Sequence, residues 1–166
     1  EAMDRLERGY RAEENWPAVV DIKVQRSSAL LDPAEKVREL LEVTEIWRSK
    51  VEDYDRATPA FEKILGIQAD HDLAFEELEK LHTAAGRWEQ LVELYLNRLE
   101  TRDRIPDRTD LLRRIAHVFE ERLDDKGQAF DALVNAFAED YGDDESVSYL
   151  ERMAQATGRW GELIQT

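Results

Sequence analysis

Side chains that could take part in chemistry are few in this sequence, and the three histidines are the first to consider. His71, His82 and His117 are widely separated. Glu79 and His82 are three residues apart, a spacing at which one helix can present a carboxylate and an imidazole to the same metal ion. Neither an HExxH motif nor a second Glu-x-x-His pair occurs. We therefore predict no metal ion and no other cofactor.

Two charged stretches allow a functional and a structural interpretation. The acidic stretch 140–145 suggests a calcium loop, but it lacks the alternating oxygen ligands and the closing glutamate of an EF-hand, so a helix-capping loop is favoured. The arginine-rich stretch 102–114 could bind an anion or an acidic peptide. Its arginines are interleaved with four carboxylates, which favours local ion pairs instead. These carboxylates are Glu100, Asp103, Asp107 and Asp110.

Motifs of the common enzyme classes are missing. There is no glycine-rich phosphate loop, no dinucleotide-binding fingerprint and no GxSxG nucleophile motif. There is also no cysteine, which removes thiol nucleophiles and thiolate metal sites but leaves the compartment open. We predict that the chain is not an enzyme, and the cytoplasm is the slightly favoured location.

Composition and charge indicate a helical protein that binds neither nucleic acid nor membranes. About half of the 166 residues are Ala, Leu, Glu, Lys or Arg, a share typical of long or repeated helices. Four prolines and seven glycines are too few for an all-β chain with many turns. The net charge of −15 repels phosphate groups, so basic or neutral protein segments are the expected partners. No apolar run is long enough to span a membrane.

The sequence repeats itself with a 72-residue period. The triplets Leu-Glu-Arg at 6–8, Leu-Glu-Lys at 78–80 and Leu-Glu-Arg at 150–152 recur at this spacing, as do Trp16, Trp88 and Trp160. Because each tryptophan has the same place in its repeat, packing between helices is favoured over partner binding. Trp47 aligns with Phe119 and is expected in the core for the same reason.

Four amphipathic helices fit within one period. In the second copy they are expected from Trp88 to about Arg102, after Asp107, after Asp125, and from Asp143 or Asp144 to Gly158. No linker interrupts the chain, so residues 1–166 are expected to form one array of about nine helices and to be a fragment of a longer array. The first copy departs at two places: Glu14-Asn15 replaces Gly-Arg, and residues 57–61 align three residues out of register.

The pattern resembles the tetratricopeptide repeat (TPR), a helix–turn–helix unit of roughly 34 residues. In the unit 109–141, the family's large and small apolar positions are matched in both helices. In the first helix they are Leu112, Ile115, Ala116 and Phe119, and in the second Ala129, Leu133 and Ala136. The resemblance extends over the whole chain in divergent units and implies an all-α, right-handed solenoid of stacked antiparallel helix pairs.

The resemblance also implies a surface. In this family the first helix of each unit lines a concave groove that binds peptides or helices of partner proteins. By matching positions, the groove residues here are Arg38, Leu41, Glu45, Arg48, Glu76, Glu79, Thr83, Asp110, Arg113, His117, Glu120, Ser148, Glu151 and Gln155. The family's Lys/Asn clamp for a C-terminal carboxylate is not reproduced, since Leu41, Glu45, Arg113 and His117 take those places.

We therefore expect a non-catalytic scaffold that binds other proteins. Two alternatives remain: an array that positions a catalytic domain elsewhere in a larger protein, and an RNA-processing scaffold built from half-TPR repeats. Self-association end to end, through apolar side chains left uncovered at truncated termini, is also expected.

Overall fold

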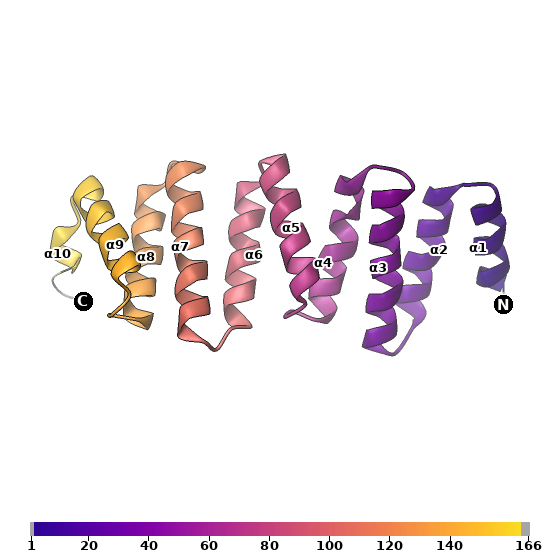
Figure 1. Ribbon diagram of the computed structural model, residues 1–166, viewed down its shortest axis with the longest axis horizontal. Helices are drawn as coiled ribbons and strands as arrows, with labels where there is room; N and C mark the ends of the chain where they lie inside the picture. Colours follow the sequence, from indigo (N-terminus) through magenta and orange to yellow (C-terminus); the bar gives the residue numbers. More distant parts are fainter. Residues whose placement is uncertain (1, 164–166) are drawn as a thin grey trace. The chain divides into compact units, whose positions relative to one another are not determined.

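The computed structural model describes residues 2–163, and every regular element in that range is a helix (Figure 1). Nine α-helices have ten or more residues, as the sequence predicts, and α10 has four. The helices are α1 (Ala2–Ala12), α2 (Trp16–Ala29), α3 (Pro33–Ser49), α4 (Thr58–Ile67), α5 (Asp72–Ala85), α6 (Trp88–Glu100), α7 (Ile105–Glu121), α8 (Lys126–Glu139), α9 (Asp144–Thr157) and α10 (Trp160–Leu163). A short 3₁₀ helix, η1 (Tyr54–Ala57), precedes α4.

The period of the sequence is also the period of the structure. Helix α3 and helix α7 have the same length and start one period apart, and the same is true of α5 and α9. Proline at the second helical position starts α7, and Asp32 caps α3, accepting a hydrogen bond from the Ala34 amide at 3.1 Å. Sequence periodicity therefore fixes the element boundaries closely.

The predicted three-residue shift at 57–61 is wrong. The η1–α4 segment spans 54–67, and both of its ends lie one full period before the ends of α8. The buried side chains of the two segments also align at this offset, with Phe61 at the position of Leu133 and Ile64 at that of Ala136. Pro59 has no amide hydrogen to donate, so the first turn is a 3₁₀ helix and the α-helix begins at Thr58. The local sequence likeness between Phe61 and Phe130 misleads, because Thr58 takes the place of Phe130.

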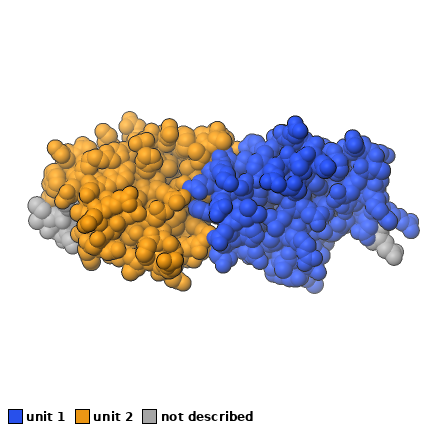
Figure 2. Space-filling view, viewed as in Figure 1, with its two compact units in different colours: residues 1–81 blue, residues 82–166 orange. Residues whose placement is uncertain are grey.

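The described chain divides into two compact units, residues 1–81 and 82–166 (Figure 2). In the first unit α1 packs on α2, α2 on α3, and α3 on η1 and α4. In the second, α6 packs on α7, α7 on α8, α8 on α9, and α9 on α10. The border falls within α5, between Leu81 and His82, so no linker loop separates the units.

The apolar core of each unit lies between consecutive helices. Leu78 on α5 and Leu150 on α9 are 1% and 2% exposed. Leu6 occupies the same repeat position on α1 but is 53% exposed, and Met3 beside it is 39% exposed. The face of α1 that corresponds to the buried faces of α5 and α9 is thus uncovered. None of the described helices is both long and apolar enough to cross a membrane.

Candidate partner-binding surface

The structure places the predicted groove residues on four first helices of the repeat: α3 and α5, then α7 and α9. Most of the set is exposed, and these are the side chains a partner could reach directly: Arg38, Glu45, Arg48, Glu76, Thr83, His117, Ser148, Glu151 and Gln155. The others are partly buried: Leu41, Glu79, Asp110, Arg113 and Glu120.

Arg113 joins α7 to the start of α9. Its guanidinium group pairs with the Asp143 carboxylate and lies 3.3 Å from Glu145. Asp143 also accepts a hydrogen bond from the Ser146 hydroxyl, which keeps the pKa of Asp143 below its usual value together with the positive charge of Arg113. Arg113 therefore positions α9, in addition to any role in binding.

Glu120 makes the second link between α7 and α9. Its carboxylate accepts hydrogen bonds from Arg152, at 2.6 and 2.8 Å, and from the Tyr149 hydroxyl at 2.7 Å. The bonds from Arg152 lower the pKa of Glu120; burial raises it, but the bond from Tyr149 adds to the lowering. The carboxylate is charged at neutral pH and fully engaged within the chain.

The first unit has a different surface at the corresponding place. Leu41 stands where Arg113 stands in the second copy, and Leu73 stands where Glu145 stands. Leu41 is partly buried, while Leu73 is 49% exposed. The link to α5 is made instead by Tyr54, whose hydroxyl donates to Glu77 at 2.5 Å. An ion pair in the second copy is thus replaced by two leucines in the first.

The histidines and the acidic loop do not form a metal site. His71 accepts a hydrogen bond from the Ala74 amide at 3.2 Å and caps α5, while His117 lies 3.5 Å from Glu121. In the acidic loop, Asp140 accepts a bond from the Gly142 amide at 2.9 Å. No group of three or more His, Asp or Glu side chains among residues 2–163 could hold a metal ion.

The arginine-rich stretch forms local ion pairs, as expected, but its strongest partners lie elsewhere. Arg114 pairs with Asp110 at 2.8 Å within α7. Arg108 instead reaches Glu139 on α8 at 2.7 Å, a residue 31 positions away. Only docking of the helices brings these two side chains together, so no local sequence signal identifies the pair.

The tryptophans occupy matching but only partly buried sites. Trp47 is 9% exposed, as expected for a core residue. Trp16 and Trp88 are half-buried, and each ring is covered by a cation from the end of the following first helix: Lys50 at 5.6 Å and Arg122 at 4.9 Å. Lys50 and Arg122 are themselves one period apart. Packing between helices thus holds for these two tryptophans, whereas Trp160 is 43% exposed.

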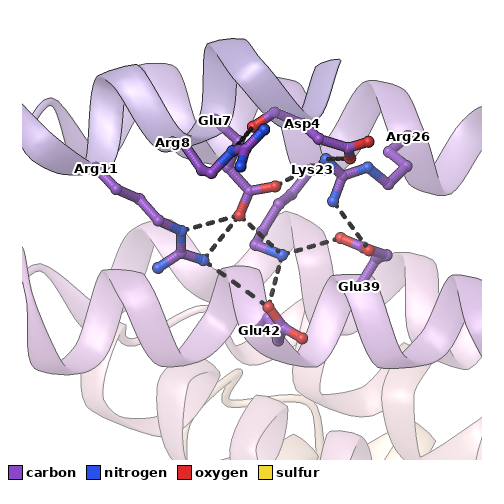
Figure 3. A network of polar contacts seen from close by, with 8 residues as sticks. All are labelled: Asp4, Glu7, Arg8, Arg11, Lys23, Arg26, Glu39 and Glu42. Carbon is purple, nitrogen blue, oxygen red and sulfur yellow. Dashed lines mark hydrogen bonds and ion pairs between the residues drawn. The ribbon is translucent and has the colours of Figure 1, made fainter. Parts of the chain in front are cut away.

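A buried charge network in α1, α2 and α3 escapes sequence analysis (Figure 3). Lys23 has a side chain that is only 3% exposed, and its ammonium group lies 2.6 Å from Glu42, 3.1 Å from Glu39 and 3.5 Å from Glu7. Arg26 lies 2.8 Å from Glu7 and 3.2 Å from Glu39. In the sequence these residues look like an ordinary solvated helix face.

The charges in this network stabilise one another against burial. Burial raises the pKa of Glu7, but the bonds from Arg11 and Arg26 outweigh this effect, and the pKa lies below its usual value. Burial lowers the pKa of Lys23, but Glu42 and Glu39 reverse the shift, and the pKa is raised. At neutral pH both groups are charged and paired, which is the condition under which a buried ion can be tolerated.

Comparison with known protein families identifies the repeat. The tetratricopeptide repeat family matches residues 74–109, which contain most of α5 and all of α6. This chain is a TPR-like helical repeat protein. No curated protein matches the chain significantly. The match begins on α5, which is a first helix in the register assumed for the predicted groove residues. Repeats of this family are typically non-catalytic, and the match suggests a protein-interaction scaffold.

Proposed function

We propose that this TPR-like chain binds basic or neutral, extended or helical segments of other proteins along its first helices. The observation that carries the proposal is the charge and exposure of that surface. The predicted groove set contains six carboxylates and three guanidinium groups, in a chain with a net charge of −15. Arg113 and Glu120 are engaged between α7 and α9, which leaves five carboxylates and two guanidinium groups and the same excess of negative charge.

The first unit offers an apolar anchor within this acidic surface. Leu73 is half exposed. In the second copy the residues at the positions of Leu41 and Leu73 are Arg113 and Glu145, and these two side chains are in contact. A partner side chain such as leucine can bury apolar surface here, while the exposed carboxylates of Glu45 and Glu76 attract basic residues. Hydrophobic contact then contributes affinity, and the charges contribute orientation and association rate.

A peptide-binding experiment tests this proposal. The probe is a synthetic basic peptide with a central leucine, and its controls are a glutamate-substituted peptide and a leucine-to-serine peptide, all measured by fluorescence anisotropy. We expect the basic peptide to bind, to weaken as salt is raised, and to lose about tenfold in affinity with Leu73→Asp or Glu76→Lys.

The matched controls lie on the outer helices. Glu62→Lys on α4 and Glu93→Lys on α6 change the same charge at exposed positions and should leave binding within about twofold. Arg98 is unsuitable for this purpose, although its sequence position suggests an outer-face residue, because it is 5% exposed. If only the outer-helix substitutions weaken binding, the concave-surface proposal is wrong.

The two alternative functions predict other outcomes. An RNA scaffold should retain single-stranded RNA on a filter at low salt and release it at high salt, which the acidic surface opposes. An array that positions a catalytic domain should leave the activity of that domain intact when groove residues are changed, but not when the array is removed.

We also propose that the array is a segment of a longer one. The support is the exposure of Leu6, at a position where Leu78 and Leu150 are almost completely buried. A helix that packs on α1 as α8 packs on α9 would cover Leu6 and Met3, so end-to-end association of isolated chains would compete with this natural packing.

A further inference from the structure

The first turn of the chain has an unusual backbone for its residue type. The turns between α5 and α6 and between α9 and α10 contain Gly86 and Gly158, whose φ angles are +65° and +72°. At the same repeat position between α1 and α2 stands Glu14, with a φ of +54°. A side chain with a Cβ in this left-handed region is strained, whereas glycine is not. The turn that holds α1 against α2 is therefore strained in a way that its two counterparts are not.

Helix α1 is also held to the chain by charge more than by apolar packing. Glu7 is the buried residue of α1. On α5 and α9 the corresponding faces bury Leu78 and Leu150, whereas on α1 Leu6 points away from the core and is exposed. The carboxylates of α1 reach α2 through ion pairs of Glu7 with Arg26 at 2.8 Å and of Asp4 with Arg26 at 3.2 Å.

The surface beneath α1 is specific for a helix with this arrangement of charges. It presents Lys23 and Arg26 from α2 and Glu42 from α3 (Figure 3). A complementary helix must bring two carboxylates one turn apart to the cations and a basic side chain to Glu42. Arg11 of α1 fulfils the last requirement at 4.0 Å. Every copy of this chain has such a helix.

We propose that two copies of this chain exchange α1, so that the α1 helix of each copy binds the Lys23–Arg26 surface of the other. The exchanged pair keeps every ion pair of the closed chain and releases the strain at both Glu14 residues, because the turn no longer has to reverse the chain direction. Strained short hinges favour such exchange, and a two-fold pair satisfies both surfaces at once.

A cross-linking experiment with two different chains tests this exchange. The chain has no cysteine, so Arg11→Cys in one chain and Glu42→Cys in another are unique thiols. Both native side chains are substantially exposed, at 39% and 52%. Their replacement removes the contacts of Arg11 with Glu7 and Glu42 and the 2.6 Å pair of Lys23 with Glu42, but leaves the pairs of Glu7 and Glu39 with Lys23 and Arg26 in place. A short bis-maleimide can join the two chains through these positions when α1 of the first lies on α3 of the second.

The mixture is incubated at ~1 mM, close to the effective concentration of a tethered helix, in about 1 M salt to loosen the ion pairs. It is then diluted into low salt and cross-linked. We expect a covalent heterodimer. With Glu14→Gly in both chains, its yield should fall about tenfold, because the closed hinge is then no longer strained. Circular dichroism checks that the Gly variant keeps its helicity.

Two controls separate exchange from end-to-end stacking. Leu6→Glu should leave the heterodimer yield within about twofold, since Leu6 lies outside the exchanged contact. A mixture of the Arg11→Cys chain with a Glu93→Cys chain sets the background of random cross-linking. The proposal is overturned if the heterodimer does not exceed this background, if Glu14→Gly leaves its yield unchanged, or if Leu6→Glu abolishes it.

Discussion

Position 23 of the repeat shows that one site can be filled by two unlike side chains. Lys23 on α2 and Tyr95 on α6 occupy the same repeat position, and both are buried, at 2% and 5% exposure. Near Lys23, the first copy has Glu39 at the repeat position where the second copy has Leu111. Tyr95 brings no charge into its site, whereas the ammonium group of Lys23 lies among three carboxylates. A cation in a buried site is tolerated only while its partners remain.

This comparison predicts the effect of removing the cation. Lys23→Met should lower the free energy of unfolding by ~3 kcal/mol, because Glu7 and Glu39 lose a buried partner. The double change Lys23→Tyr with Glu39→Leu copies the second repeat and should recover most of that loss. Urea denaturation measures both. A loss below ~1 kcal/mol for Lys23→Met would mean that the network contributes little to stability.

A buried hydroxyl gives a second prediction at this scale. Thr58 is 5% exposed, and its hydroxyl has no hydrogen-bond partner. Thr58→Val keeps the shape of the side chain and should raise the free energy of unfolding by ~0.5–1 kcal/mol. The matched control is Thr44→Val on α3, which removes a 2.8 Å bond to the Leu41 carbonyl and should destabilise the chain. A thermal melt that lowers the midpoint for Thr58→Val would contradict this prediction.

At the scale of the elements, sequence periodicity predicts the helices well because one physical signal repeats. Apolar residues at helical spacing recur in every period, and a proline lies in the first turn of both α3 and α7, so a weak local signal is confirmed by its copy. The α6 and α7 helices are found within a few residues of their predicted starts. The exception is residues 57–61, where the likeness of Phe61 to Phe130 misleads and Pro59 changes the first turn.

The links between helices could not be predicted in the same way. Arg113 and Asp143 are 30 residues apart, Arg108 and Glu139 are 31 apart, and each of these residues has closer charged neighbours in the sequence. In a chain with 37% charged residues, almost any cation has several candidate partners. Helix packing selects among them. Candidate surface residues can therefore be placed on helices from sequence, but not sorted into those that bind within the chain and those that remain exposed.

The attachment of α1 predicts a dependence on acid. The pKa of Glu7 is lowered in the folded chain, so its contribution to stability is present above the pKa of the unfolded chain and is lost as the pH falls through the lower, folded value. Below about pH 4 we expect α1 to detach before the apolar cores of the units open. The protection factors of the α1 amides, which are exchange rates corrected for the intrinsic effect of pH, should then fall while those of α7 and α8 remain high.

A substitution checks that Glu7 is responsible. Glu7→Gln keeps the side-chain size but carries no charge, so the protection factors of the α1 amides should be lower at neutral pH and nearly independent of pH. Glu79→Gln at the same repeat position on α5 is the matched comparison. Equal acid sensitivity of the α1 amides in the native chain and the Glu7→Gln variant would show that another group controls the release of α1.

At the scale of the whole molecule, each unit stabilises itself by stacking, so a helix with an uncovered face is incomplete. Leu150 is buried where α9 packs on α8, while Leu6 on the corresponding face of α1 is not covered. In a repeat array each added unit contributes its own stability and one further interface. Since α1 corresponds to α9 in the repeat, a copy of α7 and α8 is the part of this chain that would form that interface with α1.

Grafting that part in front of α1 gives the last prediction. Residues 105–144 contain α7 and α8, and joining them directly to Glu1 preserves the register of the repeat. We expect the added helices to bury Leu6 and Met3 and to slow hydrogen exchange of the α1 amides by at least about tenfold, since each buried side chain contributes ~1.5–3 kcal/mol. The same graft shortened by one residue, 105–143, is the control, because the shift rotates the helix joint and misplaces the apolar face. Two results would contradict this prediction: equal protection of α1 by the shortened graft, or unchanged protection when Leu6→Asp is made in the full graft. Either result would mean that the added helices do not pack on α1 as α8 packs on α9. The face of α1 would then not be a site for continuing the repeat.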